Sequence, residues 1–204
     1  MSIETPSAAD LENLALASRS GWPDNLRVLF ARYPREQWQS HANLGEMARF
    51  WLSRHDMFRE LASMIRAIET QFRDGTLKPS EFPRQFVPRL QFLLQQLGVH
   101  HQIEDLHYFP IFRAADERLA RGFDVLEGDH HAIHADMAAT ADTANALLRA
   151  LADKSDALKQ SDDYAAASGA LLKGLIRHLD DEEDLIVPLI LDRGEAALGV
   201  AHGV

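Results

Sequence analysis

Two short stretches of the chain repeat one pattern of potential metal ligands. HHQIEDLHYFP begins at His100, and HLDDEEDLIVP begins at His178. When the stretches are aligned on their prolines, Glu104 falls opposite Glu182, and each glutamate follows its histidine at the i+4 position. Because positions i and i+4 of an α-helix share one face, each stretch would present an imidazole and a carboxylate to the same side. Imidazole and carboxylate together suit iron, manganese or zinc, so the repeat predicts a metal site.

Other histidines have the spacing and the position to join this site. His130 and His134 are also separated by one helical turn, and His55 precedes them on an earlier helix. A helix rises about 1.5 Å per residue, so the number of residues between a histidine and the expected turn gives its height along the helix. By this count, each of the four helices brings a histidine to the same height. The predicted metal ligands are therefore His55, His100, Glu104, His130, His134, His178 and Glu182.

Composition narrows the kind of site and the kind of partner. The chain has 204 residues with ten histidines and no cysteine, so any metal must be held by histidine and carboxylate. Its net charge is −10, which disfavours nucleic acid as a partner because an acidic surface repels phosphate. The polar start predicts no signal peptide, and no apolar stretch is long enough to span a bilayer. We therefore expect a soluble, cytoplasmic protein without a membrane partner.

Apolar residues recur at helical spacing almost throughout the chain, and strand signals are nearly absent. Short connections make successive helices antiparallel, so the pattern predicts an all-α, up-down-up-down four-helix bundle. We divide the chain into an N-terminal helical extension, the bundle and a loose C-terminal tail, at residues 1–40, 41–194 and 195–204. The four bundle helices are expected at Asn43–Arg73, from Ser80 or Pro83 to Ala114, from Glu117 or Gly122 to Ala152, and Ser161–Arg193, with Ser161 as an N-cap. Two short helices are expected in the extension, at Ala9–Ser18 and Asp24–Arg32.

These residues resemble the hemerythrin family in its broad HHE cation-binding form, over roughly residues 43–193. The family pattern is a histidine on the first helix, His-x3-Glu on the second, His-x3-His on the third, and a histidine with an acid on the fourth. The resemblance implies a non-heme di-iron centre with an oxo or hydroxo bridge. It assigns His130, His134 and His178 to one iron and His55 and His100 to the other, while Glu104 and the fourth-helix acid bridge both. The second iron then keeps an open position for O2, NO or peroxide.

The acid on the fourth helix has two candidates. Four residues after His178 a helix has turned about 400°, so Glu182 lies only about 40° from the histidine. Five residues turn it about 500° and place Glu183 about 140° away, although this is the spacing of the family's oxygen carriers. The repeat favours Glu182, and we expect Glu183 to lie at most behind the ligands.

Neighbouring polar residues are expected to support the ligands rather than bind metal. His101 and His131 are rotated by about 100° from His100 and His130, so we expect them at the surface or behind the ligands. Asp105 and Asp129 are expected to accept hydrogen bonds from the outer N–H groups of ligand histidines.

Two functions from different classes fit this centre. The first is a binding protein that holds O2, or NO or peroxide, at the open iron position for storage or sensing. The alternative is a di-iron redox enzyme that acts on NO or peroxide, or serves iron delivery and iron–sulfur repair. A weaker third reading is an iron store or a structural metal site. The sequence leaves the small ligand, the enzymatic character and the oligomeric state open, because fold does not determine activity.

Overall fold

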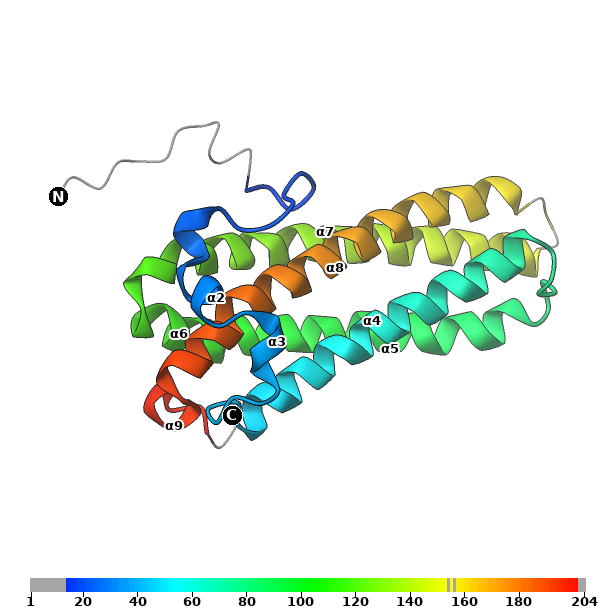
Figure 1. Ribbon diagram of the computed structural model, residues 1–204. Helices are drawn as coiled ribbons and strands as arrows, with labels where there is room; N and C mark the ends of the chain where they lie inside the picture. The colour runs from blue at the N-terminus through cyan, green and yellow to red at the C-terminus, as the bar shows by residue number, and fades with distance from the viewer. Residues whose placement is uncertain (1–13, 154, 156, 202–204) are drawn as a thin grey trace. The chain divides into compact units, whose positions relative to one another are not determined.

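In a computed structural model that describes residues 14–153, 155 and 157–201, the chain folds into α-helices joined by turns (Figure 1). No strand occurs within these ranges, so the predicted all-α class is confirmed, and the arrangement is consistent with a helical bundle. None of the helices searched, all from the described part of the chain, is both long and apolar enough to cross a membrane. The four long helices are α4 (Glu46–Arg73), α5 (Phe82–Ile103), α7 (Ala120–Ala152) and α8 (Leu158–Arg193).

Glycines end two of the long helices where the sequence predicted. After α4, Gly75 adopts a φ of 73°, and after α8, Gly194 adopts a φ of 82°. A positive φ costs glycine little because it has no Cβ, so the chain can leave the helical path at these points.

The chain divides into two compact units, and the boundaries run through the long helices. Unit 1 comprises residues 1–51, 105–132 and 176–204, and unit 2 comprises residues 52–104 and 133–175. Helices α4, α7 and α8 each contribute one segment to unit 1 and another to unit 2. The division into 1–40, 41–194 and 195–204 follows the sequence instead, and it stays a prediction.

Two side-chain contacts within unit 2 give the relative direction of α4 and α5. Phe72 near the end of α4 packs on Phe82 at the start of α5, with ring centroids 4.4 Å apart. Further back on α4, His55 meets His100 near the end of α5. Residue numbers rise along one helix as they fall along its partner, so α4 and α5 run antiparallel here.

Unit 1 contains the described part of the N-terminal extension and the end of the chain. Its short helices are η1 (Asp24–Leu26), α2 (Val28–Arg32), α3 (Arg35–Trp38), α6 (Phe109–Ala115), η3 (Glu117–Leu119) and α9 (Glu195–Leu198). The predicted helix at Asp24–Arg32 is present as η1 and α2, whereas α3 was not predicted. Of the predicted helix at Ala9–Ser18, residues 9–13 lie outside the described ranges, and residues 14–18 form turns.

Residues 195–200 are packed in the structure, although their sequence indicated part of a loose tail. Glu195 is buried and accepts hydrogen bonds from the backbone N–H groups of Met47 (3.4 Å) and Ala48 (2.8 Å). These N–H groups lie in the first turn of α4, where the helix itself offers them no carbonyl partner. A carboxylate at this position is also favoured by the helix dipole. Leu198 and Val200 are buried as well, and Glu195 joins this segment to the start of α4.

Two predicted helix boundaries need correction. Helix α8 begins at Leu158, and the N–H of Ser161 already donates to the carbonyl of Ala157 at 2.9 Å, so Ser161 lies inside the helix and is not its N-cap. The second helix does not continue regularly to Ala114. It passes from α5 into η2, a π-helical segment at Glu104–Tyr108, before α6 begins. Pro110 has no N–H to bond the carbonyl of Leu106, and the wider turn accommodates that gap.

Candidate metal centre

Unit 2 contributes a buried group of two imidazoles and one carboxylate, which we call the unit 2 cluster: His55, His100 and Glu104. The Nε2 atoms of His55 and His100 lie 3.1 Å apart, and Nε2 of His100 lies 2.9 Å from Oε1 of Glu104. His55 and Glu104 are each 1% exposed. The ligand atoms of all three residues lie within 4.8 Å of one another, so this group could hold a metal ion.

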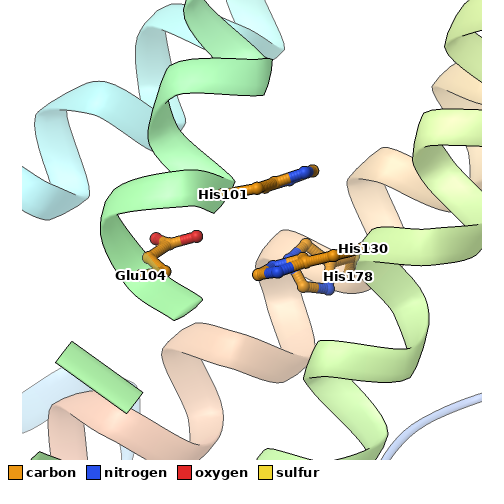
Figure 2. Close-up of side chains that lie close together, drawn as sticks. All are labelled: His101, Glu104, His130 and His178. Carbon is orange, nitrogen blue, oxygen red and sulfur yellow. The ribbon is translucent and has the colours of Figure 1, made fainter. Parts of the chain in front are cut away.

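Unit 1 contains a second group of the same composition, the unit 1 cluster: His130, His178 and Glu182. The Nε2 atoms of His130 and His178 are 3.1 Å apart, and Nε2 of His178 lies 3.4 Å from Oε2 of Glu182. Figure 2 shows the two rings brought together from α7 and α8. His178 and Glu182 are completely buried. Each half of the sequence repeat thus contributes its histidine and its glutamate to one of these two groups.

Carboxylates hold both histidines of the unit 1 cluster from behind, as the sequence predicted. Nδ1 of His130 lies 2.7 Å from Oδ1 of Asp105, and Nδ1 of His178 lies 3.4 Å from Oδ2 of Asp129. A carboxylate on Nδ1 keeps the proton there and leaves the lone pair of Nε2 for a metal. These contacts favour a proton on Nδ1 of both rings, and loss of the Nε2 proton of His178 would then free both Nε2 atoms to bind a metal.

The two rings of the unit 1 cluster differ in charge when no metal is bound. Burial lowers the pKa of His130 to about 4, despite its bond to Asp105. Burial would also lower the pKa of His178, but the carboxylates of Asp129 and Glu182 outweigh it and raise that pKa to about 10. His178 therefore carries the shared proton, and it can donate Nε2–H to the neutral His130. A bound cation would take the place of that proton.

No pattern in the sequence pointed to the arginine that contacts Asp129. Arg19 from the extension is 5% exposed, and its Nη1 and Nη2 atoms donate to the two carboxylate oxygens of Asp129. Its Nε atom donates to Oδ2 of Asp181 at 2.7 Å. Burial would raise the pKa of the Asp129 carboxyl, but hydrogen bonds from His178 and Arg19 lower it instead. Asp129 is therefore an ionised acceptor for the ring of His178.

The two candidate acids of α8 have different surroundings. Glu182 lies beside Nε2 of His178. Glu183 is also buried, but its Oε2 accepts a hydrogen bond from Nη1 of Arg35 at 2.7 Å. This arrangement agrees with the helical angles that favoured Glu182.

The remaining histidines are not placed as their spacing suggested. His134 is exposed, and its Nε2 atom lies 3.2 Å from Nδ1 of His101. His101 is completely buried, which excludes the surface and leaves the expected position behind the ligands, whereas His131 is exposed. Figure 2 shows His101 and Glu104 on successive turns of one helix. His100 and His101 both lie in regular α-helix, and the π-helical η2 changes the angles between residues only from Glu104 onward.

The chemistry of both clusters fits iron. Imidazole nitrogen and carboxylate oxygen are the ligands of non-heme iron sites, and buried carboxylates are stabilised by a cation. Each cluster offers two imidazoles and one carboxylate, and the unit 1 histidines have their outer nitrogens held by aspartates. Both sets can thus serve as metal ligands without rebuilding the helices that carry them.

Comparison with known proteins agrees with the motifs. The family model of the hemerythrin HHE cation-binding domain matches residues 46–190, which is most of the chain. The chain therefore belongs to this family of cation-binding domains. Neither a protein with curated annotation nor a solved structure matched the chain.

Proposed function

We propose that this chain is a non-heme di-iron protein of hemerythrin type, built on an antiparallel up-down-up-down four-helix bundle. The unit 1 cluster and one further imidazole hold the first iron, and His55 and His100 hold the second. Glu104 and Glu182 would supply the carboxylate ligands. One observation carries the proposal: two buried clusters of equal composition, each with two imidazoles and a carboxylate.

The further imidazole of the first iron comes from His134 or His101. The family pattern assigns the place to His134, four residues after His130. Burial favours His101, because a ligand held away from water exchanges less readily than an exposed one, and His134 is exposed. The assignment of His134 stays a prediction that variants can decide.

We propose that the centre binds O2, or a related small ligand such as NO or peroxide, for storage or sensing. Bound iron supplies a reducing centre with an open coordination position. The chain's own side chains exclude water from the rings. Phe58 packs on His100 with ring centroids 5.1 Å apart, and Phe109 stacks on His130 at 5.4 Å. A dry, apolar surrounding is what reversible binding of O2 requires, since water and protons promote loss of the electron to oxygen.

Metal content and the visible spectrum of the purified protein test this function. After expression with ample iron, we expect two iron atoms per chain. We also expect a spectrum that changes on reduction and returns to an O2-bound form in air, then reverses when O2 is removed. His55→Ala or His100→Ala should abolish ligand binding. Zinc in place of iron, or one metal per chain, would reject the di-iron proposal.

One contact favours the enzymatic alternative, which acts on NO or peroxide. Asp105, which bonds His130, also lines a surface cavity of about 650 Å³ together with Arg113 and Glu127. Its carboxylate is therefore a route by which a proton can pass between solvent and a ligand ring. If the protein is an enzyme, it should consume peroxide or NO over many turnovers, and Asp105→Asn should slow that turnover more than it lowers iron content.

A further inference from the structure

A buried arginine from the N-terminal extension contacts the carboxylate that supports one proposed iron ligand. Arg19 lies outside the region matched by the family model, which begins at residue 46. All three of its guanidinium nitrogens are engaged, with Nη1 and Nη2 on Asp129 and Nε on Asp181. Asp129 in turn lies 3.4 Å from Nδ1 of His178. A direct series of contacts thus runs from the extension to a ligand ring.

The surroundings of Arg19 fix its position. Its guanidinium lies over the ring of Trp22, 5.0 Å from the centroid, and the indole Nε1 of Trp22 donates to the backbone carbonyl of Asp181 at 2.6 Å. Arg177 binds the carboxylate of Asp181 through Nη2 at 2.6 Å and Nε at 2.8 Å. A planar guanidinium held on several sides can orient a carboxylate in a way that a mobile surface cation cannot.

The charges of this network balance while Arg19 is present. The two arginines, Arg19 and Arg177, face the two carboxylates of Asp129 and Asp181. Removal of Arg19 would leave one uncompensated negative charge in a buried position behind His178. Buried charges interact strongly because little water screens them, so the change would reach the ring and any metal bound to it.

We propose that Arg19 is a positioning residue of the metal centre, which orients Asp129 so that Asp129 holds Nδ1–H of His178 and directs Nε2 toward the metal. This inference rests on the proposed function, since it takes His178 to be an iron ligand. It assigns the N-terminal extension a role in the chemistry of the centre, in addition to covering the helices.

Three variants separate orientation from charge. In Arg19→Gln both are lost, so iron should leave to a chelator about 10-fold faster or more, as for other residues that support metal ligands. The midpoint potential should also fall, because the added negative charge favours the oxidised metal. Arg19→Lys keeps the charge but cannot reach both aspartates with one nitrogen. We expect it to restore the potential toward the wild-type value while iron release stays fast.

Arg35→Gln is the matched control. Arg35 also comes from the extension and also binds two acids of α8, Glu183 and Asp184, at 2.7 Å each. Its loss should leave iron release and potential close to those of the wild type. If Arg19→Gln and Arg35→Gln behave alike in both measurements, Arg19 has only a structural role and the inference is wrong.

A measurement on the metal-free protein keeps this inference separate from the proposed function. Nitrogen-15 NMR of His178 reports where its ring protons lie and how fast they exchange with water. We expect a protected Nδ1–H in the wild type and in Arg35→Gln, and faster exchange in Arg19→Gln. Equal protection in all three would overturn the role of Arg19. Failure of the wild type to bind iron would instead reject the proposed function, and the NMR comparison would still decide the role of Arg19. Should Arg19→Gln not fold, Arg19→Lys supplies the same comparison.

Discussion

Two adjacent glutamates of α8 differ in the groups that contact them, and that difference favours Glu182 as the proposed metal ligand. Glu182 lies 3.4 Å from Nε2 of His178, whereas the carboxylate of Glu183 bonds Arg35. Helical geometry puts Glu182 on the same face as His178 and Glu183 well away from it. The helical geometry and the observed contacts therefore both favour Glu182 as the proposed ligand.

The first prediction compares these two acids. Glu182→Gln removes the charge of a proposed ligand, and metal affinity should fall by more than the about 10- to 100-fold typical of residues that only support ligands. Glu183→Gln should lower iron content little, although it weakens the contact with Arg35. Iron content after passage through a chelating column measures both. The reverse order would move the site to the five-residue spacing.

The second prediction compares His101 of α5 with His134 of α7, which contact each other. His101 is completely buried and His134 is exposed, with 3.2 Å between their nitrogens. Because His101 is buried and His134 is exposed, we expect His101→Ala to lower iron content more than His134→Ala. His131→Ala, an exposed neighbour, serves as a control and should leave iron content unchanged. A loss confined to His134→Ala would support the family pattern instead.

Among the helical elements, the segment between α5 and α6 could not be predicted from the sequence. The spacing of His100 and Glu104, and that of His178 and Glu182, predicted that the two members of each pair share one helix face, because regular α-helix sets those angles. The π-helical segment at Glu104–Tyr108 was not predicted, and it alters the angles beyond Glu104. Pro110 signalled an irregularity but not its form, since a proline can bend a helix, end it or follow a wider turn.

Elements outside the bundle helices were the least predictable. Arg19 was expected between two short helices of the extension, and Glu195 in a loose tail, and no pattern in the sequence indicated a polar partner for either residue. In the structure both residues are buried through specific polar contacts, Arg19 with Asp129 and Glu195 with the start of α4. Such contacts join polar groups that are far apart in the sequence, so a local sequence pattern does not reveal them.

The third prediction concerns the contact between α9 and α4. Glu195→Ala removes the acceptor for the N–H of Ala48, so the free energy of unfolding should fall by about 1–2 kcal/mol, as for lost helix caps. Gly45→Ala should act similarly, because a Cβ at Gly45 would lie 2.2 Å from Oε2 of Glu195 and push the carboxylate away. Urea unfolding of the metal-free protein measures both.

Exposed Glu46 in the same first turn supplies the control. Glu46→Ala should leave the urea midpoint close to that of the wild type. If Glu195→Ala is as mild as Glu46→Ala, the buried contact does not stabilise the start of α4.

At the scale of the whole molecule, the two clusters belong to different compact units, while α4, α7 and α8 continue through both. A metal that binds only the folded protein stabilises it by mass action, in proportion to the logarithm of its concentration over Kd.

The fourth prediction follows from this linkage. Iron at a free concentration 100-fold above its Kd should raise the free energy of unfolding by about 2.7 kcal/mol for each independent site. Thermal unfolding under anaerobic conditions, with and without ferrous iron, should show a clear rise in Tm for the wild type. His131→Ala should keep the full rise, because its side chain is exposed, whereas His178→Ala should lose most of it, because His178 is buried in the unit 1 cluster. Loss of the rise in His55→Ala as well would show that both clusters contribute to one cooperative centre. A rise that survives in His178→Ala but vanishes in His55→Ala would mean that only the unit 2 cluster binds metal, and the di-iron proposal would be wrong.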